Sequence, residues 1–309
     1  MAQKTLVVKV PAPDQGPLRD RLSVGTFEFR TVPHALFSVK GEGTVATLYK
    51  SGKFVIQSAD PEAFLAAYTD LSVTPAPEQS AAERQLARID EPVIGSDETG
   101  KGDYFGPLVV CAVYLEPADV AEIKEAGIVD SKRLTDKRAG LLGAWLRGRV
   151  PFSIQRLDPP EYNRVYPTYR GLNPLLADLH GRAVRDLIET LATRRHAAGG
   201  NDPLRVVVDQ FAHESVMLRA LRGTEVRLEQ APRAEANPAV AAASVIARQE
   251  FLACMNELST EFGADLRKGA GTLVDDAGRE LVRTHGAEVL TQVAKMHFKN
   301  TQKILPDAS

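Results

Sequence analysis

The segment Ile94-Gly-Ser-Asp-Glu-Thr-Gly-Lys-Gly-Asp-Tyr-Phe-Gly-Pro107 joins two apolar stretches, residues 92–97 and 107–115. The flanking apolar residues predict two strands, and the glycines predict a connection whose backbone a polyanion can approach closely. Asp97 and Glu98 are adjacent acids at the end of the first strand. Carboxylate oxygens suit a hard divalent cation such as Mg²⁺, so this segment predicts one half of a metal site.

The same segment also matches a phosphate-binding loop, because residues 95–101 fit the pattern G-x-x-x-x-G-K. Gly102 stands where that pattern needs a Ser or Thr hydroxyl for magnesium. A Val-rich strand follows, whereas such a loop requires a helix whose N-terminus faces phosphate. The carboxylates of Asp97 and Glu98 would also repel phosphates, so the sequence disfavours a nucleotide-binding loop.

Two further acids are candidates for completing the metal site. Asp209 ends the apolar segment 204–209, where a buried strand reaches the surface. Glu235 precedes a helix expected from residue 237 to about residue 262, which is rich in small residues. A turn or capping role is the alternative for each acid, because carboxylates are favoured near helix N-termini. Sequence physics alone does not decide between the two roles of Glu235.

Composition divides the chain into three parts. Residues 1–72 contain two β-rich runs across a Gly turn and one short helix, which predicts a small α+β domain. Residues 73–89 hold prolines and few large apolar side chains, and we interpret them as a linker. Residues 90–309 alternate strands and helices, which predicts an α/β domain with a mixed sheet flanked by helices.

The overall composition is that of an ordinary folded protein. Its 309 residues are 44% apolar and 25% charged, and 38 Lys and Arg against 40 Asp and Glu give a net charge of −2. No positive field of the whole protein therefore indicates a polyanionic partner. Cys111 and Cys254 lie in apolar surroundings and predict neither a disulfide framework nor a zinc site. No signal peptide or membrane span is expected, which predicts a cytoplasmic protein.

Several segments together resemble the type 2 ribonuclease H family, and within it the ribonuclease HIII group. The most specific is the segment of residues 95–110, and supporting matches occur at 129–135, 208–209, 241–248 and 295–300. Residues 48–57 resemble the small TATA-binding-protein-like domain that precedes the catalytic domain in that group. Ribonuclease HII usually has Gly-Arg-Gly at residues 100–102 and lacks the N-terminal domain, so ribonuclease HIII is the nearer group.

This resemblance implies a ribonuclease H-like fold and an endonuclease that hydrolyses the RNA strand of RNA/DNA hybrids. Two Mg²⁺ or Mn²⁺ ions would activate water and stabilise the leaving oxygen, giving 5′-phosphate and 3′-hydroxyl ends. The implied catalytic acids are Asp97, Glu98, Asp209 and, in a position where many relatives have Asp, Glu235. The first three are the expected metal ligands, with Asp97 bridging the ions. Glu98 can join Asp97 only if the strand has ended there, since consecutive side chains of a strand point to opposite faces.

The resemblance also implies which residues bind the substrate. In the catalytic domain they are Gly100, Lys101, Gly102, Ser131 and Lys132. In the N-terminal domain they are Tyr49, Lys50, Ser51 and Lys53, around the hairpin turn. A solvated lysine is the alternative for Lys132, and a plain surface turn is the alternative for the hairpin.

Two other functions stay open on the sequence. A ribonuclease HII-like enzyme would cut at single ribonucleotides embedded in DNA, and a non-catalytic protein would bind the hybrid without cutting it. The intact acids Asp97, Glu98 and Asp209 argue against the second. We expect an RNA/DNA hybrid duplex as the partner, no association with membranes, and a monomer.

Overall fold

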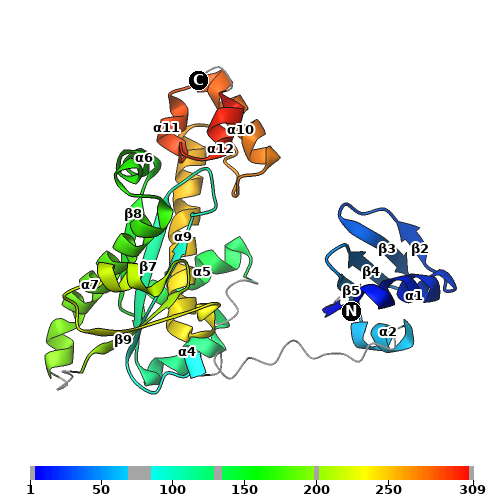
Figure 1. Cartoon of the computed structure of the whole chain (residues 1–309), viewed down its shortest axis with the longest axis horizontal. Coiled ribbons are helices and arrows are strands. Elements are labelled where there is room, and N and C mark those ends of the chain that lie inside the picture. The colour runs from blue at the N-terminus through cyan, green and yellow to red at the C-terminus, as the bar shows by residue number, and fades with distance from the viewer. Residues whose placement is uncertain (1–3, 69–84, 129–133, 198–201, 306–309) are drawn as a thin grey trace. The chain divides into compact units, whose positions relative to one another are not determined.

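The computed structural model describes residues 4–68, 85–128, 134–197 and 202–305. The chain divides into two compact units, Met1–Ser80 and Ala81–Ser309, each of which is described by itself (Figure 1). In the described part of the chain, no helix is long and apolar enough to cross a membrane. Cys111 and Cys254 are both free and buried.

The N-terminal unit is a five-stranded antiparallel sheet in the order β1-β5-β4-β3-β2. The strands are β1 (Lys4–Lys9), β2 (Glu28–Arg30), β3 (Ala35–Gly41), β4 (Thr44–Tyr49) and β5 (Lys53–Ser58). Helices α1 (Ala12–Ser23) and α2 (Pro61–Tyr68) contribute Leu22 and Leu65 to a core that includes Phe54 and Ile56. The alternating burial along β5 shows that the core covers one face of the sheet and leaves the other open.

The larger unit contains a mixed five-stranded sheet in the order β10-β9-β6-β7-β8. The strands are β6 (Val93–Thr99), β7 (Leu108–Leu115), β8 (Phe152–Leu157), β9 (Leu204–Asp209) and β10 (Val226–Ala231). Strands β6, β7 and β8 pair antiparallel, whereas β9 runs parallel to both β6 and β10. The predicted mixed sheet flanked by helices is therefore confirmed.

Helices cover both faces of this sheet (Figure 1). Helix α7 (Leu172–Ala197) belongs to the apolar cluster on one face, and α9 (Pro238–Glu261) belongs to the cluster on the other, where α5 (Asp136–Arg147) packs on α9. The remaining helices are η1 (Pro117–Asp119), α4 (Val120–Glu125), α6 (Pro159–Val165), η3 (Tyr166–Thr168), α8 (Glu214–Ala220), η4 (Ala234–Ala236), α10 (Thr272–His285), α11 (Val289–Val293) and α12 (Lys299–Ile304).

The small residues of α9 let its backbone lie directly on β6. A Cβ atom added to Gly95 would lie 2.2 Å from the carbonyl carbon of Ala239 and 2.2 Å from the nitrogen of Val240. This close approach fixes the strand just before Ser96 and Asp97 and thereby positions the first acidic segment.

The end of the predicted linker belongs to the larger unit. Most of residues 73–89 lie outside the described residues, but Leu86 and Ile89 are buried in the α9-side core. Asn237 Nδ2 donates a 2.8 Å hydrogen bond to the carbonyl of Leu86 and ties this segment to the start of α9. The sequence did not indicate this packing because the two apolar residues stand singly among polar ones.

A buried lysine fastens the connection between β6 and β7. Lys295 Nζ donates hydrogen bonds to the carbonyl oxygens of Phe105, Gly106 and Pro107 at 3.3, 2.6 and 3.3 Å. Burial lowers the pKa of Lys295 to about 7, while three carbonyl acceptors favour the ammonium form. The buried Lys295 side chain thus fixes the backbone of residues 105–107 in the larger unit.

Candidate active site

Asp97 and Asp209 lie at the carboxyl ends of neighbouring parallel strands. The last β6–β9 pair is Ser96↔Val208, and the next residue on each strand is an acid. Parallel strands bring such residues to the same edge of the sheet. The charge of Asp209 contributes to raising the pKa of Asp97, which shows that the two carboxyl groups interact.

The carboxyl of Asp97 is partly buried and surrounded by hydrogen-bond donors. The backbone N–H of Glu98 donates to Asp97 Oδ1 at 2.9 Å, and the hydroxyl of Ser244 on α9 also bonds this carboxyl. Desolvation by burial, followed by the charge of Glu98, raises the pKa of Asp97 to about 7 against the lowering effect of these bonds. The carboxylates of Glu98 and Asp209 thus place negative charge beside Asp97, and a bound cation would neutralise this charge.

Glu98 reaches the site from the other face of the sheet. Strand β6 continues to the pair Thr99↔Val109, so the expectation that the strand ends at Glu98 is wrong. The physical reason is that β7 continues to pair with β6 beyond the point where β9 stops. Glu98 consequently faces α7, yet its charge still raises the pKa of Asp97.

Both oxygens of Glu98 have partners. Oε2 lies 3.2 Å from Nε2 of His180, and Oε1 accepts a hydrogen bond from Lys101 Nζ at 2.6 Å. Burial alone would raise the pKa of Glu98, but His180 and the Lys101 ammonium together lower it to about 2. Glu98 is therefore a fixed carboxylate at neutral pH.

A positive charge already lies beside all three carboxylates. Desolvation lowers the pKa of Lys101, but the carboxylates of Glu98, Asp97 and Asp209 outweigh it and raise the pKa overall. Gly100 precedes this lysine with a φ of 96°, and a Cβ there would lie 2.2 Å from the carbonyl oxygen of Pro107. A glycine is required at residue 100 for both reasons, and it leads into the exposed residues Lys101 and Gly102.

The segment that carries Glu235 is tied to Asp209. The backbone N–H of Ala234, the first residue of η4, donates to Asp209 Oδ1 at 2.9 Å. Glu235 is the next residue and is partly exposed. Its segment is therefore adjacent to the paired acids, while its role as the fourth acid stays a prediction.

The other predicted substrate-binding residues fall in two places. Ser131 and Lys132 lie outside the described residues. Lys50, Ser51 and Lys53 are exposed around the β4–β5 turn of the N-terminal unit, where Tyr49 is partly exposed. Residues of this turn are bonded within their own unit, since Lys50 N–H donates to the carbonyl of His34 at 3.0 Å.

Sequence reasoning missed His180 and Ser244. Neither has a spacing typical of a ligand or catalytic motif. For His180 the available signal was one polar residue on an otherwise apolar helix face. Such a residue is more often a satisfied core residue, so this signal is weak. Ser244 lies within residues 241–248, which support the family resemblance, but that match gave the serine no role.

The chemistry of the acids fits a hard divalent cation. Asp97, Glu98 and Asp209 provide only oxygen donors, as Mg²⁺ and Mn²⁺ prefer. Within the described residues, no three His, Cys, Asp or Glu side chains already form a coordination shell. Both oxygens of Glu98 are bonded within the protein, one to Lys101 and one to His180.

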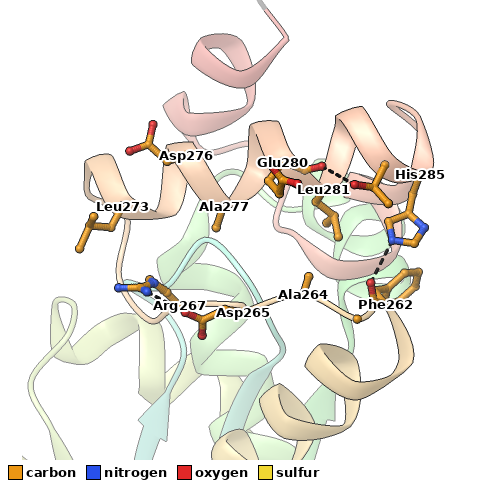
Figure 2. Close-up of a pocket in the computed structure, with 12 residues that line it drawn as sticks. Phe262, Ala264, Asp265, Arg267, Leu273, Asp276, Ala277, Glu280, Leu281 and His285 are labelled. Carbon is orange, nitrogen blue, oxygen red and sulfur yellow. Dashed lines mark hydrogen bonds and ion pairs between the residues drawn. The ribbon is translucent and has the colours of Figure 1, made fainter.

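A separate cleft of about 380 Å³ lies between α10 and the segment that follows α9 (Figure 2). Its polar groups are already engaged: Arg267 pairs with Asp265 at 2.7 Å, and His285 Nε2 lies 2.9 Å from the carbonyl oxygen of Phe262. None of the predicted site residues lines it. The acids at the sheet edge are therefore the better candidate for a reactive centre.

The chain is similar to ribonucleases along most of its length. A family model described as Ribonuclease HII matches residues 94–301, and a domain of unknown function, DUF3378, matches residues 5–81. Ribonuclease HIII of Bacillus licheniformis is 36% identical over 285 residues, which cover 88% of this chain and 89% of that protein. The chain belongs to the ribonuclease HIII family. Ribonuclease HIII of Protochlamydia amoebophila is also 36% identical, and the match covers 89% of this chain and 88% of that protein.

Solved structures agree with membership of the ribonuclease HIII family. A crystal structure of Bst-RNase HIII in complex with Mn²⁺ has a TM-score of 0.66 and 33% identity, and the match covers 99% of both chains. Aquifex aeolicus RNase H3 has a TM-score of 0.52 and 26% identity, with 95% of this chain and 100% of that chain covered. The resemblance read from the motifs and the fold that it implied are both confirmed, and the protein is a ribonuclease H.

Proposed function

We propose that this protein hydrolyses the RNA strand of RNA/DNA hybrids and that Asp97, Glu98 and Asp209 bind the divalent cations of the reaction. The observation that carries the proposal is that β6 and β9 bring Asp97 and Asp209 to one sheet edge, with Glu98 beside them, in a chain of the ribonuclease HIII family. The non-catalytic alternative is disfavoured by this intact arrangement. The ribonuclease HII-like alternative is disfavoured because the ribonuclease HIII relatives match most of the chain.

Divalent cations, when bound, would polarise the scissile phosphate and activate the attacking water. We propose two ions, either Mg²⁺ or Mn²⁺, and the Mn²⁺ complex of Bst-RNase HIII supports Mn²⁺. The protein supplies carboxylates that are held in place before binding: Asp97 by Ser244 and the Glu98 amide, Asp209 by the Ala234 amide. Glu235 is proposed as the fourth acid, because its segment follows that amide directly.

Lys101 is proposed to contact a phosphate of the RNA strand. Its ammonium lies at the open side of the acids, and the exposed Gly102 leaves the neighbouring backbone accessible. Gly100 supports this contact through the φ of 96° that turns the chain toward Lys101. Ser131 and Lys132 are proposed as a second phosphate contact on the basis of the sequence motif alone.

The N-terminal unit is proposed to bind the hybrid through Tyr49, Lys50, Ser51 and Lys53. Lys53 pairs across the sheet with Lys9, and the next pair on the same open face is Val7↔Val55. Two lysines beside an apolar pair, of which Val7 is exposed and Val55 partly exposed, suit a nucleic-acid backbone, where phosphate neutralisation dominates affinity. The cytoplasmic location and the monomeric state expected from the sequence stay predictions.

Replacing Asp97 by Asn tests the proposal. We expect Asp97→Asn to abolish cleavage of a fluorescently labelled hybrid, because the amide cannot provide a charged ligand, while hybrid binding measured by fluorescence anisotropy stays detectable. Asp276→Asn, the same change at an exposed acid of α10, controls for handling of the protein and should still cleave. An Asp97→Asn variant that cleaves at the wild-type rate would refute the metal site.

The substrate class is tested by two duplexes of equal length. One carries a continuous RNA stretch opposite DNA, and the other carries a single ribonucleotide embedded in DNA. We expect efficient cleavage of the first in Mg²⁺ or Mn²⁺. Strong preference for the second would favour the ribonuclease HII-like activity.

A further inference from the structure

His180 connects the segments that carry the candidate acids. It lies in the middle of α7 with no exposed surface, on a helix face that also buries Leu176 and Leu179. Its two ring nitrogens meet two side chains of β6. Nδ1 lies 2.7 Å from Ser96 Oγ, and Nε2 lies 3.2 Å from Glu98 Oε2.

The surroundings of His180 fix the ring in position. Ser96 and Glu98 are two residues apart and so share one face of β6, and Ser96 Oγ donates to the carbonyl of Cys111 on β7 at 2.9 Å. The ring stacks on Phe211, with centroids 5.1 Å apart and planes inclined by 12°. Phe211 follows Asp209 by two residues. One imidazole therefore contacts the strand of Asp97 and Glu98 and the segment that leaves Asp209.

A core-filling role alone does not account for histidine at this place. Burying an imidazole costs free energy unless its nitrogens find partners, and a leucine would fill an apolar helix face without that cost. The Nε2 atom is directed at the carboxylate of Glu98, whose several side-chain torsions could otherwise adopt other rotamers at the strand edge.

We infer that His180 is a positioning residue for Glu98. It holds Oε2 from the buried side, so that Oε1 points toward the proposed metal site, where it now accepts a hydrogen bond from Lys101. The inference rests on the proposed function, in which Glu98 is a metal ligand. Partners that orient a ligating group change metal affinity or activity by roughly 10–100-fold when they are replaced. His180 would act in this way without touching substrate.

Two substitutions separate the two contacts of His180. The amide nitrogen of Gln can take the place of Nε2 and reach Glu98, whereas the amide of Asn takes the place of Nδ1 and reaches only Ser96. We expect His180→Asn to lose roughly 10-fold or more in Mn²⁺ affinity and in kcat, with an unchanged KM for hybrid, and His180→Gln to stay within about threefold of the wild type. Isothermal titration calorimetry on the full-length metal-free protein measures the first quantity, and steady-state cleavage measures the others.

A purely structural role predicts a different result. In that case both variants would lower the unfolding temperature, and Mn²⁺ affinity and kcat would stay at wild-type values or fall equally in both. Either result would overturn the inference. If His180→Asn does not fold, Ser96→Ala replaces it: removing the partner of Nδ1 should lower Mn²⁺ affinity, and wild-type affinity in that variant would also overturn the inference.

Glu98→Gln distinguishes failure of the inference from failure of the proposed function. If Glu98→Gln binds Mn²⁺ and cleaves like the wild type, Glu98 is no ligand and the proposed function fails at this residue. If Glu98→Gln is impaired and His180→Asn is not, only the inference fails. With both correct, adding His180→Asn to Glu98→Gln should cause no further loss of kcat, since both changes remove the same interaction.

Discussion

Burial and the neighbouring negative charges both raise the pKa of Asp97. Desolvation, then Glu98 and also Asp209 raise its pKa to about 7, although Ser244 and a backbone amide bond the carboxylate. A neighbouring carboxylate, Glu98, has its pKa lowered to about 2 because His180 and Lys101 bond it. The two adjacent acids are thus held in different protonation states near neutral pH by their own surroundings.

The pKa of Asp97 predicts how metal binding depends on pH. Below pH 7 a proton on Asp97 must leave before a cation binds, so Mn²⁺ affinity should rise up to about tenfold per pH unit toward pH 7 and level off above pH 8. Isothermal titration calorimetry at pH 6, 7 and 8 in two buffers of different ionisation enthalpy measures affinity and proton release. Mn²⁺ binding at pH 6 without release of a proton would contradict the prediction.

Lys101 predicts opposite effects on two ligands. Its ammonium lies 2.6 Å from the carboxylate of Glu98, where it would compete with the proposed cation, and it is proposed to contact phosphate. Lys101→Met should therefore strengthen Mn²⁺ binding to the substrate-free protein by several-fold and weaken binding to the hybrid. Lys124→Met on α4 serves as a charge-matched control for both measurements. Loss of both affinities together would show that Lys101 does not oppose the cation.

The contact of α9 with β6 makes Gly95 a sensitive position at the scale of the elements. In Gly95→Ala the added methyl group would lie 2.2 Å from backbone atoms of Ala239 and Val240, so β6 and α9 must separate. We expect a loss of roughly 3 kcal/mol or more in the free energy of unfolding, and a melting temperature lower by about 2–4 °C per kcal/mol.

Gly140→Ala provides the matched control for this measurement. Gly140 lies within α5, and a Cβ there would have no neighbour within 4 Å. The helix should gain a little stability, since alanine has the higher helix propensity. Equal melting temperatures for the Gly95 and Gly140 variants, measured by circular dichroism, would contradict the packing argument.

The sequence predicts those parts of the site that depend on single strands. Asp97 and Asp209 each end an apolar run, and such runs identify strand ends without knowledge of their neighbours. The end of β6 was predicted too early, because the strand continues through its pairing with β7 up to Thr99↔Val109. Pairing between strands is a property of the assembled sheet, so local sequence does not reveal it.

Residues that act across elements were harder to predict. His180 joins β6 from a helix more than 80 residues further along the chain, and its neighbours give only the pattern of a buried helix face. Leu86 and Ile89 look like isolated apolar residues, yet both are buried in the larger unit. In each case the deciding contact lies far away in the sequence.

At the scale of the whole molecule, the two units have different proposed roles: the N-terminal unit strengthens binding of the hybrid, and the larger unit carries the acids and contacts the RNA strand. Deleting residues 1–75 removes nearly all of the N-terminal unit, Met1–Ser80, and leaves Asp97, Glu98 and Asp209 in place. We expect KM for the hybrid to rise about tenfold or more, because two linked binding units gain affinity from each other, while kcat should change much less. Steady-state cleavage over a range of hybrid concentrations separates these quantities.

The salt dependence of binding provides an independent check. If Lys50 and Lys53 each neutralise one phosphate, the slope of log affinity against log salt should become shallower by roughly 1.4–1.8 in the deletion variant. The Asp97→Asn background, in which we expect no cleavage, allows binding to be measured by anisotropy on intact hybrid. An unchanged slope would mean that the N-terminal lysines do not contact the backbone.

The parallel pairing of β6 with β9 also determines when the enzyme can first act during its synthesis. It joins Ser96 to Val208, more than 100 positions apart, so the ribosome completes β6 long before β9 exists. Contacts between such distant segments form slowly, whereas the hairpins of the N-terminal unit join near neighbours. An unfinished chain therefore carries Asp97 and Glu98 without Asp209, and if these acids act together as proposed, nuclease activity would begin only after the sheet has closed.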